Sequence, residues 1–140
     1  MGKHTYHFGG SFEHLPYSHV VRAGNFLFVS GTVAWDDTAN APVAGGIEAQ
    51  TTAILEKIKG MLESVGSSLD SVVKATVYLT DSRDFPGMNR VYKTYFPERP
   101  PARATVGVTL MAPGLLIEME AIALAEESIS ANTNQQTAED

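Results

Sequence analysis

The chain has no cysteine, no long apolar run and no cluster of basic residues, and each absence excludes a class of protein. Without cysteine there is no disulfide framework, no thiolate nucleophile and no cysteine-based zinc site. This composition is typical of a reducing compartment, so we expect a cytoplasmic protein. No window approaches the roughly 20 apolar residues of a membrane span, and the N-terminus lacks the apolar core of a secretory signal. We therefore expect no membrane partner.

The distribution of charged and histidine residues excludes two further classes of site. The formal net charge is -6 and the ten Lys and Arg residues are scattered. Because nucleic-acid backbones are bound by clustered basic residues, this charge weighs against a nucleic-acid partner. The four histidines show no recognised ligand spacing, and His4 and His7 point to opposite faces of an extended strand. We therefore predict no metal site.

The composition predicts one domain followed by a tail. A chain of 140 residues with 44% hydrophobic content is long enough to bury one core. Residues 126–140 contain one isoleucine and no other large apolar side chain, so they cannot bury enough surface to offset the entropy lost on ordering. We predict a single domain over residues 1–125 and a disordered C-terminal tail over residues 126–140.

The first half of the domain reads as strands followed by a helix. Residues 4–8 are a candidate short strand, and residues 18–31 form a hairpin around the turn signal Ala23-Gly24-Asn25. Residues 32–46 are rich in small and turn-forming residues and are expected to form a surface loop. Apolar residues recur at helical spacing over residues 47–65, and Gly66 lies where a left-handed residue ends a helix.

The second half adds a strand, a helix and two strands. Residues 71–80 alternate as a strand, and residues 83–96 form a helix with Pro86 in its first turn. Residues 102–110 and 115–124 flank a turn and are expected to close the fold as an antiparallel hairpin. The order predicts an α+β fold in which a mixed sheet carries both helices on one face.

The other face of this sheet would be uncovered. We expect it to carry Arg103, Thr105, Glu118 and Glu120 among apolar residues. Such a face is too apolar to remain in water and too charged for an ordinary core, so an oligomer interface that holds a polar site resolves the conflict.

The expected hairpin sets a distance between two of these residues. If Leu110 pairs with Leu115, Glu118 faces Gly107, which is about 13 Å from Arg103 along its strand. One chain would then hardly bring both groups to one small molecule. A cleft assembled from two chains relaxes that limit, and a different register changes the distance.

Four stretches together resemble one known family. They are "LPYSHVVRAGNFLFVSG", "VVKATVYLTD", "PPARATVGV" and "IEMEAIA", and the resemblance to the RidA/YjgF/YER057c/UK114 family covers residues 12–125. It implies a chorismate-mutase-like (YjgF/L-PSP) fold that assembles as a homotrimer, with a central barrel and three intersubunit clefts. It also implies an enamine/imine deaminase, which hydrolyses 2-aminoacrylate-type intermediates to 2-keto acids and ammonia. An imine is already electrophilic, so this chemistry needs no metal or cofactor.

The resemblance assigns the two catalytic positions to Arg103 and Glu118. The planar guanidinium of Arg103 would bind the carboxylate of a small-molecule substrate, because its donors match the two carboxylate oxygens. Glu118 would hold the attacking water and assist proton transfer. Glu120 lies on the same strand face as Glu118, so spacing alone does not choose between them. Each glutamate has the alternative reading of an ion-pair partner for Arg103 or Lys74.

The resemblance also implies five substrate-binding residues. Tyr17 would form a wall of the cleft, and Ser30 and Gly31 would end a strand where the backbone approaches the ligand. Asn89 would lie near the cleft, and Thr105 stands where many relatives carry cysteine. Four of them have an ordinary structural alternative: packing for Tyr17, a strand-ending turn for Ser30 and Gly31, and an exposed helix position for Asn89.

Other functions stay open at this point. Leu15 replaces the glycine usual in the family, and with Trp35 it fits an aminomuconate-deaminase-like enzyme with a larger substrate. A noncatalytic keto-acid-binding regulatory trimer would need only Arg103, whereas hydrolysis also needs a placed water. Some family members carry an endoribonuclease label, against which the acidic charge weighs.

Overall fold

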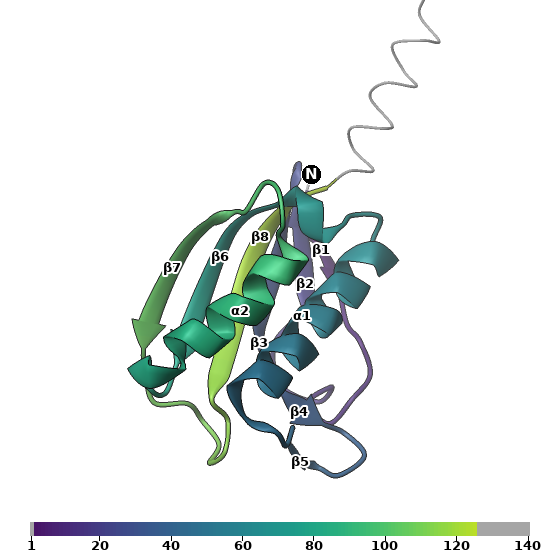
Figure 1. Ribbon diagram of the computed structural model, residues 1–140. Helices are drawn as coiled ribbons and strands as arrows, with labels where there is room; N and C mark the ends of the chain where they lie inside the picture. The colour runs from purple at the N-terminus through teal and green to yellow at the C-terminus, as the bar shows by residue number, and fades with distance from the viewer. Residues whose placement is uncertain (1, 126–140) are drawn as a thin grey trace, which may run out of the picture.

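The computed structural model describes residues 2–125 as a six-stranded mixed sheet with two α-helices in front of it (Figure 1). The predicted disordered tail lies outside the described residues. The elements are β1 (His4–Tyr6), β2 (Val20–Ala23), β3 (Phe26–Val33), β4 (Trp35–Asp36), β5 (Ala41–Pro42), α1 (Gly46–Ser64), β6 (Val72–Leu79), α2 (Phe85–Tyr95), β7 (Ala102–Gly107) and β8 (Ile117–Leu124). Short 3-10 turns precede β6 and α2. The α+β class is confirmed.

The strand order is β1-β2-β3-β8-β6-β7. All neighbouring strands are antiparallel except β6 and β7, which run parallel because α2 connects them as a crossover. The C-terminal strand β8 therefore lies in the middle of the sheet, between β3 and β6.

The closing hairpin expected from the sequence is wrong. β7 pairs only with β6, and β8 pairs with β3 and β6, so the two strands are not neighbours. Glu118 lies opposite Tyr78 rather than Gly107. The loop of residues 108–116 spans the end of β6 instead of forming a tight connection, because β6 occupies the place next to β8. A turn signal marks where the chain reverses but does not say which strands pair.

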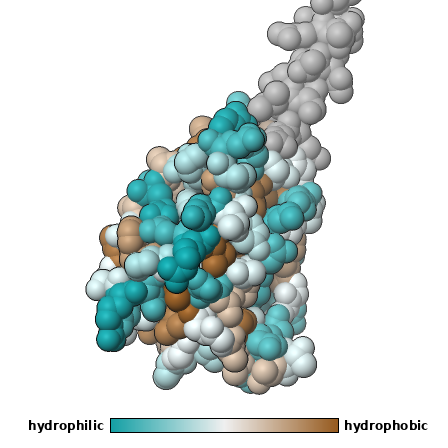
Figure 2. Space-filling view, viewed as in Figure 1, coloured by the Kyte–Doolittle hydropathy of each residue, from teal (hydrophilic) through white to brown (hydrophobic). Residues whose placement is uncertain are grey.

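One face of the sheet forms the core with both helices. Alternate residues of the inner strands are buried against α1 and α2, which is the pattern of a sheet covered on that side. The largest fully buried side chains include Leu27, Ile54, Leu55, Ile58, Leu62, Met88, Ile117 and Met119. Figure 2 shows this helix-covered side, where hydrophilic residues occupy much of the surface.

Most local signals of the sequence are confirmed. Gly24 has a φ of 61° in the β2–β3 turn, Gly66 has a φ of 83° just after the C-cap residue of α1, and Pro86 lies in the first turn of α2. The loop expected over residues 32–46 contains the short strands β4 and β5. Within residues 2–125, no helix combines the length and apolar character needed to cross a membrane.

The opposite face of the sheet carries no helix. Its exposed apolar residues include Phe26, Phe28 and Val106, which are 42%, 44% and 44% exposed. Glu118, Glu120 and their cross-strand neighbours share this open face. Large apolar side chains that are grouped on one face are typical of an interaction surface, and the open face has this character.

Candidate functional site

Arg103 and Glu118 lie on opposite faces of the sheet, which corrects the expectation that they share one. Arg103 is paired with Ala75, whose side chain is buried against the helices. Glu118 is paired with Tyr78, on the open face. Paired residues of neighbouring strands point to the same side, so the register alone separates the two groups. They are also two strands apart, roughly 10 Å across the sheet, and their rows are three residues apart, roughly another 10 Å along the strands.

Glu118 folds over the backbone of Gly31. β3 and β8 shift register between Val29 and Thr32, and Gly31 lies in this bulge. A Cβ atom built on Gly31 would lie 3.1 Å from the carboxyl carbon of Glu118 and closer still to one oxygen. Only glycine leaves room for the carboxylate at this place. The sequence motif thus reflects a contact between two distant segments of the chain.

Tyr17 and Ser30 lie close to Gly31 and Glu118. The Ser30 hydroxyl donates a hydrogen bond of 2.5 Å to the Ser18 carbonyl, and the Ser30 backbone N–H donates to the His19 carbonyl at 2.9 Å. These bonds attach the Tyr17 segment to β3. The Tyr17 ring lies against the His19 ring in a tilted arrangement, with an interplanar angle of 55° and centroids 5.6 Å apart. Ser30 therefore positions Tyr17 as well as lining the cavity.

These residues line one cavity of about 510 Å³. Tyr17, Ser30, Gly31 and Glu118 form its polar part. Its other lining residues are Phe12, Leu15, Val33, Trp35, Met111, Ala112 and Leu115. Four of the residues assigned from the resemblance are thus brought together in one chain. Phe12, Met111 and Leu115 were missed, because no local pattern places their loops beside β8.

Glu118 is held where its proton affinity is increased. Burial raises the pKa of Glu118, and the nearby charge of Glu120 raises it further. Glu120 accepts a hydrogen bond from the Tyr78 hydroxyl. Burial, and then the Glu118 charge, raise the pKa of Tyr17, so this phenol stays protonated at neutral pH. A half-buried carboxylate beside a hydroxyl donor is suited to moving protons.

Arg103 is positioned by aromatic side chains of α2. Its guanidinium carbon lies 4.6 Å from the Tyr92 ring centroid and 5.7 Å from that of Phe85, and one nitrogen is 3.9 Å from the Met88 sulfur. Stacking of this kind orients the planar group. Among residues 2–125, no carboxylate forms an ion pair with Arg103. Its charge is therefore available to an anion.

The remaining two assigned residues lie on the Arg103 side. Thr105 is paired with the buried Val77 and points to the same face of β7 as Arg103, so the expectation that Thr105 lies on the uncovered face is also wrong. Asn89 is half-buried on α2, next to Met88. Neither residue lines the cavity that contains Glu118. A single chain thus divides the assigned residues into two groups.

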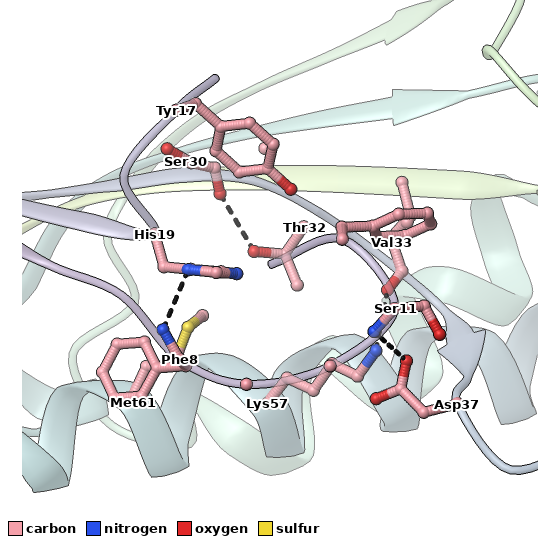
Figure 3. A pocket seen from close by; sticks show the side chains of 14 residues that line it. Phe8, Ser11, Tyr17, His19, Ser30, Thr32, Val33, Asp37, Lys57 and Met61 are labelled. Atoms are coloured by element: carbon pink, nitrogen blue, oxygen red, sulfur yellow. Dashed lines mark hydrogen bonds between the residues drawn. The ribbon is translucent and has the colours of Figure 1, made fainter. Parts of the chain in front are cut away.

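A second cavity of about 300 Å³ lies on the other side of Tyr17 (Figure 3). It is lined by the N-terminal segment, β3 and α1. It shares five residues with the first cavity: Phe12, Tyr17, Ser30, Gly31 and Val33. Figure 3 shows the His19 ring reaching into it and Lys57 rising from α1 below. The His19 Nδ1 accepts a hydrogen bond from the Phe8 backbone N–H at 3.1 Å, so the neutral ring carries its proton on Nε2.

Lys57 has a structural role in this second cavity. Its amino group donates to the Trp35 carbonyl at 2.9 Å and to the Val33 carbonyl at 3.4 Å, which fixes the end of β3. Burial lowers the pKa of Lys57, and the charges of Asp37 and Asp36 oppose this shift. Across residues 2–125, no group of three or more His, Asp or Glu side chains is arranged to hold a metal ion.

The fold and the arrangement around Glu118 define a class of protein. The sequence model of the family described as Endoribonuclease L-PSP matches residues 12–125, and the chain belongs to this family, to which the RidA and YjgF proteins belong. A RutC family protein from Pyrococcus abyssi is 49% identical over 111 residues, which are 79% of this chain and 87% of that protein.

Two further relatives support this membership. The 3-aminoacrylate deaminase RutC from Acinetobacter baylyi is 40% identical over 108 residues, which cover 77% of this chain and 86% of the relative. A solved structure of a Rid family protein from Yersinia pestis superposes with a TM-score of 0.80 at 30% identity. The match covers 88% of this chain and 99% of that structure.

Proposed function

We propose that the chain is an enamine/imine deaminase that hydrolyses 2-aminoacrylate-type intermediates to 2-keto acids and ammonia. The observation that carries this proposal is the cavity in which Glu118 lies over Gly31, beside the protonated Tyr17. A relative that is 40% identical is named a 3-aminoacrylate deaminase, which supports the same class of substrate.

In the proposed reaction, the enamine first tautomerises to the imine. Glu118 accepts a proton from a water molecule while the water oxygen adds to the imine carbon. Glu118 returns that proton to the nitrogen, which gives the neutral carbinolamine. Glu118 then accepts the proton of the carbinolamine hydroxyl and passes it to the nitrogen, so that the C–N bond breaks, ammonia leaves and the carbonyl forms. One water is consumed and one ammonia is released, so no redox partner is needed. A carboxylate whose pKa is raised is well matched to this alternation between base and acid.

We propose that Arg103 binds the substrate carboxylate from a neighbouring copy of the chain. Within one chain Arg103 is on the opposite face from Glu118, yet it has no acidic partner in the described residues. The exposed Phe26, Phe28 and Val106 supply an apolar surface for association. A homotrimer with clefts between subunits, each lined by Arg103 of one copy and Glu118 of the next, accounts for both observations.

The test compares wild type, Arg103→Ala and Glu118→Gln on 2-aminoacrylate and 2-iminobutyrate, generated in place by a pyridoxal-phosphate dehydratase from serine and threonine. Wild type should accelerate keto-acid formation, and each variant should lose about 100-fold or more. Arg83→Ala is the matched control, because Arg83 is an exposed arginine paired with Asp81 outside the cavity.

Two results would contradict the proposal. If wild type accelerates neither reaction but binds a 2-keto acid through Arg103, the chain is a ligand-binding protein rather than a deaminase. If both variants retain wild-type rates while Arg83→Ala does too, the assigned residues do not carry the chemistry.

A further inference from the structure

Gln50 is a buried amide that joins separate segments of the chain. It lies in α1 and is 2% exposed. Its side-chain nitrogen donates hydrogen bonds to the Val43 carbonyl at 3.0 Å and to the Gly114 carbonyl at 2.9 Å. Its side-chain oxygen accepts a hydrogen bond from the Leu116 backbone N–H at 2.9 Å. Both donors and the acceptor of the amide are therefore used.

The segments that this amide joins form two walls of the cavity around Glu118. The loop of residues 108–116 receives two of the bonds and supplies Leu115 to the lining. The third bond holds Val43, directly after β5, and β5 pairs with β4, whose Trp35 also lines the cavity. Figure 1 shows the first turn of α1, β4, β5 and the beginning of β8 at the same end of the molecule. One side chain thus holds together two walls that come from distant parts of the sequence.

The loop and β5 also touch each other where the amide binds them. Gly114 has a φ of 90°, and a Cβ atom built on it would lie 3.2 Å from the Pro42 ring. The loop therefore packs closely against β5 at this point, where glycine is favoured. All of these contacts lie within one chain and around a buried side chain, so they do not depend on a neighbouring copy.

The bond to the Leu116 N–H fixes where β8 begins. Leu116 directly precedes β8, in which Glu118 is the second residue. The Leu116 carbonyl accepts a hydrogen bond of 3.1 Å from the Thr80 backbone N–H, which follows β6. The backbone of Leu116 is thus held on both sides, two residues before the glutamate whose carboxylate lies over Gly31. A displacement of Leu116 would pass to Glu118, because only one residue separates them.

We propose that Gln50 is a positioning residue for the reaction at Glu118. Its three hydrogen bonds hold the loop of residues 108–116 and the start of β8 in the place that keeps the Glu118 carboxylate over Gly31. Gln50 does not line the cavity, so it acts through the backbone of Leu116 and not on the substrate. This inference rests on the proposed deaminase function and adds a residue on which the placement of its carboxylate depends.

Gln50→Met tests this role, because methionine has a similar length and removes all three hydrogen bonds. Gly114 is exposed and Leu116 is half-buried, so water can bind the freed backbone groups and the variant should fold, but water does not tie the segments together. We expect kcat for keto-acid formation to fall about tenfold or more, and KM to change less than about twofold, because the misplaced group moves protons and does not bind the substrate carboxylate. A wild-type kcat in the folded variant would overturn the inference.

Thr51→Val is the matched control. Thr51 is the next residue of α1, is fully buried, and donates its hydroxyl to the Ile47 carbonyl of the same helix at 2.7 Å. The change removes a buried hydrogen bond without touching the loop, so the thermal midpoint may be lowered only together with an unaltered kcat, measured at a temperature at which all three proteins are folded. If Thr51→Val lowers kcat as much as Gln50→Met does, the effect is a general loosening of α1 and the inference is overturned.

A titration separates failure of this inference from failure of the proposed function. The side-chain carboxyl carbon of Glu118, assigned with Glu118→Gln, is followed by 13C NMR against pH. Burial is the main cause that raises the pKa of Glu118, so a carboxylate that is no longer held against Gly31 should titrate at lower pH in Gln50→Met and as in wild type in Thr51→Val. If wild type hydrolyses no imine but this shift is found, the deaminase proposal fails and the positioning role stands. An unchanged titration in Gln50→Met overturns the positioning role, whatever the activity.

Discussion

Glu118 and Arg103 lie in two regions of the molecule that are built differently. Around Glu118, a single chain supplies the close contact with Gly31, the hydroxyl of Tyr17 and a cavity that is open to solvent. Around Arg103, the chain supplies an oriented cation over Tyr92 at the edge strand β7, without a carboxylate partner in residues 2–125. The first region is a cavity without a cation that could bind a substrate carboxylate. The second region has such a cation but lies outside that cavity.

The difference between the Glu118 region and the Arg103 region indicates where a second chain would be needed. A substrate carboxylate needs a cation, and the cavity around Glu118 contains none in one chain. Rotation of the Arg103 side chain cannot bring its guanidinium group into the cavity of the same chain, because Arg103 points to the opposite face of the sheet from Glu118. If Arg103 of one copy lay beside Glu118 of another, the cavity would gain a cation and neither chain would need to change its fold.

Mixing two inactive variants tests this most directly and should give the largest effect. Arg103→Ala and Glu118→Gln, unfolded and refolded together in equal amounts, should regain about a quarter of wild-type activity, because random assortment restores one cleft in about four. Each variant refolded alone stays at its low rate. Activity is measured as keto-acid formation. Refolding without recovery, although mixed oligomers form, would mean that both groups act within one chain.

Replacing Gly31 tests the Glu118 region by itself. In Gly31→Ala the new Cβ collides with the Glu118 carboxylate, which lies at the end of a flexible side chain and can move aside. We expect activity to fall about 10- to 100-fold while the free energy of unfolding changes by less than about 1 kcal/mol. Keto-acid formation and thermal unfolding measure the two quantities.

Gly60→Ala is the matched control for this variant. Gly60 lies inside α1, and a Cβ atom there meets nothing within 4 Å. This change should leave activity unaltered and stabilise the fold by about 0.5–1 kcal/mol, because alanine favours a helix interior. Equal activity in Gly31→Ala and wild type would show that the position of Glu118 over Gly31 is not required.

The elements were predictable where their cause is local. The helical spacing of Ile54, Ile58 and Leu62, the turn at Gly24 and the helix end at Gly66 each depend on neighbours in sequence, and the structure confirms them. The place of β8 in the sheet was not predictable in this way. Its residues alternate equally well in a terminal hairpin or between β3 and β6, and only tertiary pairing decides.

The same limit applies to the candidate site. The motif resemblance identified Glu118 and Gly31, and the structure brings them into contact. The resemblance did not place Arg103 on a face, because a side chain's face depends on the register with the next strand. The pairing of Arg103 with Ala75 defines that register, and it joins two strands that are separated in the sequence by α2. Phe12 and Met111 reach the cavity from loops whose course has no periodic signal.

The smallest expected effect concerns the proton affinity of Glu118. Glu118 must be ionised to accept a proton from water, so activity should fall as pH drops through its pKa. Burial and the Glu120 charge raise that pKa above the ordinary glutamate value, and the fall therefore begins at a higher pH than for an exposed glutamate. The titratable groups that face Glu118 are Glu120 on β8, Tyr78 on β6 and Tyr17.

Glu120→Gln should move the acidic side of the pH–activity profile to lower pH by several tenths of a unit, because it removes a like charge and leaves the burial of Glu118 in place. Tyr78→Phe is the control, since it removes the hydrogen bond to Glu120 but keeps the Glu120 charge, and the profile should not move to lower pH. The measurement is kcat/KM against pH for all three proteins. A profile that is unchanged in Glu120→Gln would mean that the acidic side reports the titration of a group other than Glu118.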